Sequence, residues 1–251
     1  MGSVSSATAI VIPFGTDKVA PEQISLKQTE DGQKFECRLP HVVIDPTAGL
    51  ALRLNSGGLE FGEPPPLPEM PAVADQLNYL RNHIQLYCTV WDKYPRMFLD
   101  SYFAFILRQV MDHGPELMRS VARFQDLYRF DDWAFSALRP LPRAHLPAPD
   151  ATEMPGRDAA EMIRVDFAFW TGTEIIAIDV LGSETRGISH DRRRAGLHQT
   201  GVRVIEVTRE SLDPARSRDF EAGLPAAFQQ FWEEEALPSG PFRTEIPPTP
   251  V

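Results

Sequence analysis

The chain has 251 residues, 43% of them hydrophobic and 10% aromatic, and its formal net charge at pH 7 is −10. This length and apolar content are enough for one sizeable core with a smaller appendage, as in an ordinary soluble globular protein. The acidic balance argues against a protein that coats nucleic acid by charge alone, because Lys and Arg contacts to phosphates supply that binding. The longest apolar-rich run, residues 97–111, contains Asp100 and Arg108 and is shorter than the roughly 20 residues that a membrane-spanning helix needs.

The N-terminus shows no basic region ahead of a long apolar segment, so no secretory signal is expected. Cys37 and Cys88 lie far apart and lack metal-ligand spacing, which predicts buried free thiols in a reducing compartment. We therefore expect a cytoplasmic protein that has no membrane partner.

Short alternating runs predict a small β-rich N-terminal unit over residues 1–60. The expected strands are ISLKQ, KFECRL, HVVID and LALRLN, and turn signals separate them. Residues 61–74 contain five prolines and predict a linker, because proline lacks the amide hydrogen that regular structure uses. This segment fits either a rigid surface strap or a partner-binding motif.

The hydrophobic period then changes to three and four residues, which predicts a helical segment. The expected helices cover residues 75–91, 95–113 and about 115–128. After them, the alternation from Trp133 to Leu141 predicts a strand, and residues 142–161 predict a Pro-rich polar loop.

Two apolar strands follow, and each carries one acid. The run RVDFAFW contains Asp166 and the run EIIAIDV contains Asp179, with a tight hairpin turn at Gly172-Thr173 between them. An isolated ionised carboxylate is costly in apolar surroundings, so this pattern indicates either a bound divalent cation or a well-paired structural cluster.

An arginine-rich helix and another strand complete this region. Ser189 is a suitable N-cap, Gly201 suits the left-handed end of the helix, and the apolar run VRVIEV predicts a crossover into the same sheet. Residues 186–203 contain five arginines against one acid, which could contact a phosphate backbone or form a solvated helix face. The chain then predicts helix to about residue 236, broken near Pro225, and a disordered tail over 237–251.

A helix, three strands with two acids, a second helix and a further strand form a pattern similar to the PD-(D/E)XK nuclease fold. The runs VDFAF, AIDVLG and DRRRAGLHQTGVRVIEV resemble very-short-patch-repair and DUF559-type endonuclease-like domains, over about residues 115–210. The resemblance implies an α+β protein with an α/β core, in which helices flank a mixed central sheet of restriction-endonuclease-like type. This core would lie within a larger unit over residues 75–236.

The resemblance also implies a function, that of a metal-dependent endonuclease that cleaves phosphodiester bonds of DNA or of RNA. Asp166 and Asp179 match the family's strand acids, and Glu116 could match an acid on the preceding helix. Glu116 also suits a helix N-terminus for electrostatic reasons alone. These acids and the Val180 carbonyl would hold Mg²⁺ or Mn²⁺, which acidifies a water and neutralises the phosphate. The arginines expected to bind nucleic acid are Arg186, Arg192, Arg193 and Arg194.

The family's lysine is missing, because its position is occupied by Leu181 and no lysine follows Lys93. The remaining cations are arginines, which stay protonated, so His190 is the group left for proton transfer near neutral pH. Glu184 could serve as an extra metal ligand.

Two other classes of function stay open. One is a catalytically inactive nuclease-fold subunit that binds nucleic acid or a partner protein, and the other is a hydrolase built on His83, His113 or His190. By analogy with restriction, repair and phage-defence effectors, the expected partners are nucleic acid, with DNA preferred over RNA, an activating protein and a second copy of the chain.

Overall fold

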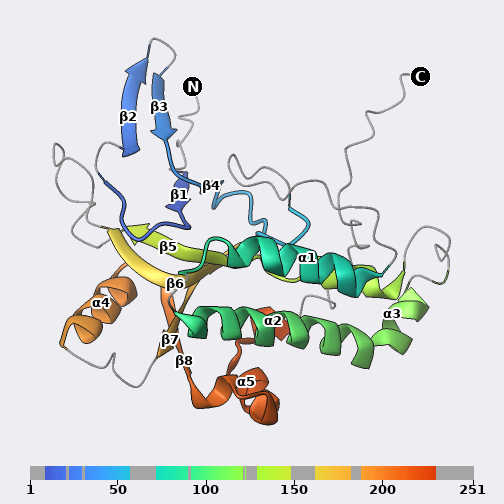
Figure 1. The fold of residues 1–251 in the computed structure, drawn as a ribbon. Coiled ribbons are helices and arrows are strands. Elements are labelled where there is room, and N and C mark those ends of the chain that lie inside the picture. The colour runs from blue at the N-terminus through green and yellow to red at the C-terminus, as the bar shows by residue number, and fades with distance from the viewer. Residues whose placement is uncertain are drawn as a thin grey trace, which may run out of the picture.

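A four-stranded mixed sheet forms the centre of the computed structural model, which describes residues 9–20, 23–29, 32–56, 72–89, 92–120, 122, 129–147, 162–181 and 188–229. Its strands, in spatial order, are β5 (Leu141–Pro147), β6 (Met162–Trp170), β7 (Ile175–Leu181) and β8 (Arg203–Thr208) (Figure 1). The first three pair antiparallel, and β8 pairs parallel with β7 after a crossover through α4 (Ile188–Gln199). The expected α+β architecture, a mixed sheet flanked by helices, is therefore confirmed.

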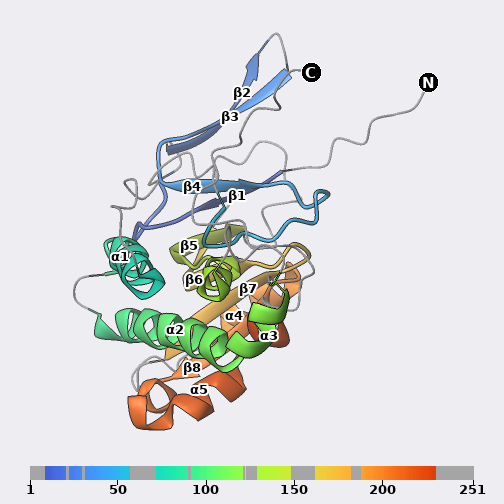
Figure 2. The same ribbon diagram turned by 90° about the vertical axis from the view of Figure 1, so that its right-hand side faces the viewer.

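Helices cover one face of the sheet. α1 (Val73–Gln85) and α2 (Lys93–Asp112) lie there with the C-terminal helices α5 (Ser217–Gly223) and α6 (Ala226–Gln229) (Figures 1 and 2). Their apolar stripes meet Phe167 and Phe169 of β6, and the Phe169 and Phe228 rings lie 4.7 Å apart between centroids. This aromatic core fixes α2 against β6 and β7.

The opposite face is covered by α4 and by two of the four N-terminal strands, β1 and β4. β1 (Ile10–Pro13) pairs with β4 (His41–Ile44), and β2 (Ile24–Thr29) pairs with β3 (Gly32–Cys37). Ile12, Val42 and Leu197 of α4 share a second apolar cluster with Ala168 and Ala177 of the sheet. The first and fourth strands of the N-terminal segment therefore belong to the packing of the central sheet.

Two strand predictions are wrong. The alternating segment from Trp133 is a 3₁₀ helix, η2 (Phe130–Ser136), and the strand lies later, in the segment predicted to be a loop. Both Trp133 and Phe135 are buried, which a short 3₁₀ helix over α2 allows. The later strand tolerates Pro142 and Pro147 because β5 is at the edge of the sheet, where a missing amide hydrogen costs little.

The run LALRLN also forms no strand. Within it, Arg53 makes one isolated antiparallel bridge to Leu138. The Leu52 amide donates to the Trp170 carbonyl at 3.1 Å, so the N-terminal segment is tied to the turn after β6.

Among the other boundaries, α1 ends at Gln85, earlier than the expected end at residue 91, and some segments lie outside the described residues. The third helix, α3, covers Gly114–Ser120, and two short 3₁₀ turns, η4 (Glu210–Leu212) and η5 (Pro214–Arg216), precede the C-terminal helices. Gly172 and Gly201 have positive φ angles of 99° and 77°, as the expected turn and helix end require. Cys37 and Cys88 are free thiols, and only Cys88 is fully buried. Residues 57–71 and 230–251, which include most of the expected linker and all of the expected tail, lie outside the described residues.

Candidate functional site

Asp166 and Asp179 lie at the point where the central sheet divides. The β6–β7 ladder ends at the pair Phe167↔Ile178, and the two acids occupy the next position on each strand. Beyond that point β6 continues beside β5 only, and β7 continues beside β8. The structure therefore brings the two sequence-predicted acids together, at a fork between two strand pairs.

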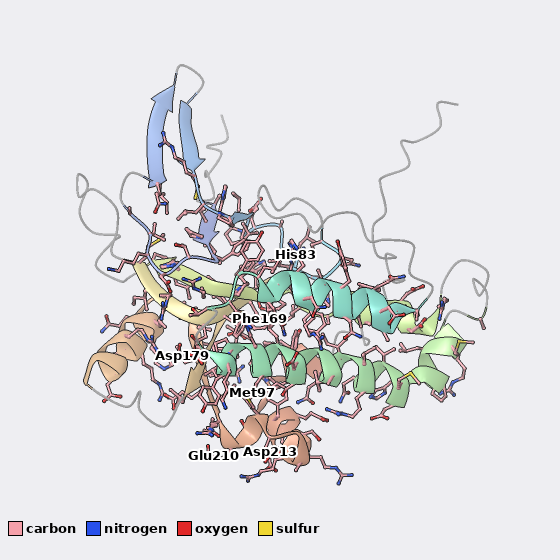
Figure 3. All side chains as sticks on the ribbon, viewed as in Figure 1. His83, Met97, Phe169, Asp179, Glu210 and Asp213 are labelled. Atoms are coloured by element: carbon pink, nitrogen blue, oxygen red, sulfur yellow. The ribbon has the colours of Figure 1, made fainter. Side chains whose placement is uncertain are left out.

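Asp179 is deeply buried and already has a cationic partner. Side chains alternate along a strand, so Asp179 faces the same side as Ala177, which is the α4 side. Its side chain is 2% exposed, and its Oδ2 accepts a hydrogen bond from Arg193 Nη2 at 2.8 Å. Arg193, predicted to bind nucleic acid, thus contacts the predicted metal ligand. Figure 3 labels Asp179, which lies on β7.

Asp166 occupies a different environment on the neighbouring strand. Its Oδ2 accepts a hydrogen bond from the Val180 amide at 2.8 Å, so its side chain replaces a backbone acceptor where the ladder ends. Burial raises the pKa of this carboxyl group to about 6, the Val180 hydrogen bond opposes the rise, and the negative charge of Asp179 adds to it. The two carboxylates are therefore close enough to repel each other.

A third acid, Glu206, was not anticipated from the sequence. The β7–β8 register places Glu206 beside Asp179, and its Oε1 lies 2.8 Å from Arg194 Nη1. Consecutive arginines of α4 thus pair with acids on consecutive strands. The register of the run VRVIEV against AIDVLG is the signal that could have revealed this acid.

Glu116 does not join the acid pair. It lies on α3, at the end of the 20-residue helix α2 opposite to α4 and the fork (Figure 1). Its side chain is 67% exposed, and its Oε2 is 3.7 Å from His113 Nδ1. Among the described residues, no three His, Cys, Asp or Glu side chains form a group that could hold a metal ion.

The other positions singled out in the sequence are either buried or lie outside the described residues. Leu181, at the position of the family's lysine, is 7% exposed and pairs with Thr208 of β8. Arg186 and Glu184 lie outside the described residues. His190 and Arg192 belong to α4, but their side chains lie outside the part that the structure describes.

The donor set at the fork suits a hard divalent cation only after a rearrangement. Two carboxylates can hold Mg²⁺ or Mn²⁺, because these ions keep several waters and need few protein ligands. Asp179 already holds one positive group, since the Arg193 guanidinium takes its Oδ2. The acids therefore fit such an ion if Arg193 leaves Asp179.

Comparison with known proteins assigns no family. No family model matches the chain, and no curated protein or solved structure was found to be similar to it. Within the described residues, no helix is both long and apolar enough to cross a membrane.

Proposed function

We propose that the chain is a metal-dependent nuclease that cleaves phosphodiester bonds of nucleic acid, preferably DNA, at Asp166 and Asp179. The main support is the placement of these two acids at adjacent strand positions, beside a helix that carries arginines. The order of helix, three strands, helix and strand also agrees with the restriction-endonuclease-like type that the sequence motifs imply. We therefore include the restriction-endonuclease-like fold type in this proposal.

Each residue near the fork has a role in this proposal. Asp166 and Asp179, with the Val180 carbonyl, would hold Mg²⁺ or Mn²⁺. When bound, such an ion supplies Lewis-acid stabilisation of the phosphate charge and lowers the pKa of water. Arg193 and Arg194 would bind phosphate oxygens bidentately, and His190 of α4 would serve in proton transfer.

A cleavage assay on purified protein tests this function. Labelled single- and double-stranded DNA and RNA are incubated with EDTA, Mg²⁺ or Mn²⁺. Cleavage is expected with either metal ion and not with EDTA, and Asp166→Asn and Asp179→Asn should each lower its rate by about 100-fold or more. Glu174→Gln is the matched control, since it removes one acid just before β7, where Glu174 pairs with Arg203 at 3.8 Å. Full activity of both Asn variants would contradict the proposal.

A second candidate is a catalytically inactive nuclease-fold subunit that binds nucleic acid or a partner protein. The buried Leu181 and the Arg193–Asp179 ion pair favour it, because the first removes a charge from the site and the second neutralises an acid. A gel shift with DNA, without cleavage in Mg²⁺ or Mn²⁺, would support this candidate over the first.

A further inference from the structure

The ion pair between Arg193 and Asp179 connects the buried acid to the surface of α4. Asp179 is 2% exposed at its side chain, whereas Arg193 is 34% exposed. One nitrogen of the guanidinium therefore binds a buried carboxylate while part of the same side chain reaches solvent. Such a group can meet an incoming ligand without any opening of the sheet.

A divalent cation and Arg193 compete for Asp179. Arg193 donates to Oδ2, and two positive groups on one buried carboxylate would repel each other in surroundings where charges are poorly screened. The guanidinium does not lose its charge at any ordinary pH, so it cannot leave by deprotonation. It can leave when another anion offers equal or better pairing, and phosphate does so through two parallel hydrogen bonds.

We propose that Arg193 is an exchangeable counter-ion, which leaves Asp179 for a phosphate group of the nucleic acid and so opens the acid pair to a divalent cation. This role rests on the proposed nuclease function and adds an order of events to it. Nucleic acid binds first with Arg193, and the metal ion binds second. Metal affinity and nucleic-acid affinity must then rise together, by the same factor, because coupling between two sites is reciprocal.

Arg194 is a natural comparison within the same helix. Its Nη1 lies 2.8 Å from Glu206, as close as Arg193 lies to Asp179, but both side chains are more exposed, at 45% and 27%. It is the next residue after Arg193, and replacing either arginine with Gln changes the charge of α4 by the same amount. If only the net charge of α4 affected Mn²⁺ binding, the two arginines would behave alike.

The test measures Mn²⁺ binding to the full chain by isothermal titration calorimetry, without and with a phosphorothioate DNA duplex that resists cleavage. In the absence of DNA, Arg193→Gln should bind Mn²⁺ about tenfold more tightly than the wild type, and Arg194→Gln should match the wild type. DNA should tighten Mn²⁺ binding to the wild type by about tenfold and to Arg193→Gln by less than about twofold. Asp179→Asn should bind Mn²⁺ weakly in both conditions.

Each outcome bears on one proposal or on both. Equal Mn²⁺ affinity of the wild type and Arg193→Gln, with an equal effect of DNA, overturns the exchange and leaves the nuclease proposal standing. Absence of Mn²⁺ binding and of cleavage in every variant overturns both. If Arg193→Gln fails to fold, Arg193→Lys keeps the charge but loses the bidentate geometry. It should then show a smaller effect of DNA on Mn²⁺ affinity, and an undiminished effect would overturn the exchange.

Discussion

The sequence predicts that Asp179 is an acid on an apolar strand, but it does not predict which group pairs with this acid. An acid that ends an apolar run must be neutralised in some way, by a metal ion or by a cationic side chain. Which of the two occurs depends on how α4 is rotated about its axis over β7, and rotation follows from packing around Leu197, which lies four residues beyond Arg193. The sequence pattern therefore predicts the acid pair, and the structure adds that Arg193 faces it.

The buried ion pair predicts unequal stability losses for two neighbouring arginines. Arg193→Gln removes the guanidinium that pairs with the buried Asp179 carboxylate. Because Arg193 is 34% exposed, the expected loss of unfolding free energy, about 1–3 kcal/mol, is below the full cost of breaking a buried pair. Arg194→Gln breaks a more exposed pair and should cost less than about 1 kcal/mol. Urea unfolding in EDTA measures both free energies.

A double variant separates the contribution of the Arg193–Asp179 pair to stability from the other contributions of α4. Adding Asp179→Asn to Arg193→Gln removes both charges, so the double variant should recover part of the stability that Arg193→Gln loses. Equal losses in Arg193→Gln and Arg194→Gln, or additive losses in the double variant, would mean that Arg193 and Asp179 do not stabilise each other.

At the scale of elements, segments with long apolar runs could be predicted from the sequence, whereas segments that mix apolar residues with prolines or polar residues could not. β6, β7 and β8 could be predicted because long apolar runs with a Gly-containing turn leave few alternatives. β5 could not, because its two prolines read as a loop unless it is known to be an edge strand. The alternation of Trp133 and Phe135 with less apolar residues predicts a strand. The 3₁₀ helix η2 buries the same two side chains, so the pattern does not distinguish the two kinds of element.

The hairpin turn between β6 and β7 yields a prediction about two glycines. A Cβ atom at Gly172 would lie 2.5 Å from the Gly49 carbonyl oxygen, whereas a Cβ at Gly201 would have no atom within 4 Å. Both residues have positive φ angles, so alanine adds strain of about 1–2 kcal/mol at either position. Gly172→Ala should lose more, about 3–4 kcal/mol, because backbone must also move. Thermal unfolding of the two variants checks this, and equal losses would mean that the 49–54 segment does not abut the turn.

At the scale of the whole molecule, β1 and β4 share one apolar cluster with the central sheet. The sequence predicts a separate β-rich unit, because the Pro-rich residues 61–74 divide the chain there. Periodicity cannot show that β1 and β4 cover the face of the sheet opposite α2, since that contact joins residues more than 100 positions apart. Val42 of β4, for example, is 4% exposed within this cluster.

Two adjacent valines of β4 test whether this packing makes the folding of the chain cooperative. Val42 is 4% exposed and Val43 is 49% exposed, so the same substitution removes the same atoms from the core and from the surface. Val42→Ala should lower the free energy of unfolding by about 2 kcal/mol, and Val43→Ala should change it by less than about 0.5 kcal/mol. Tryptophan fluorescence follows the change around the buried Trp133 and Trp170, which lie in the helical and the sheet parts. If the strands and the sheet unfold together, Val42→Ala shifts the urea midpoint seen by fluorescence and by circular dichroism equally, whereas an independent N-terminal unit would leave the fluorescence midpoint unchanged.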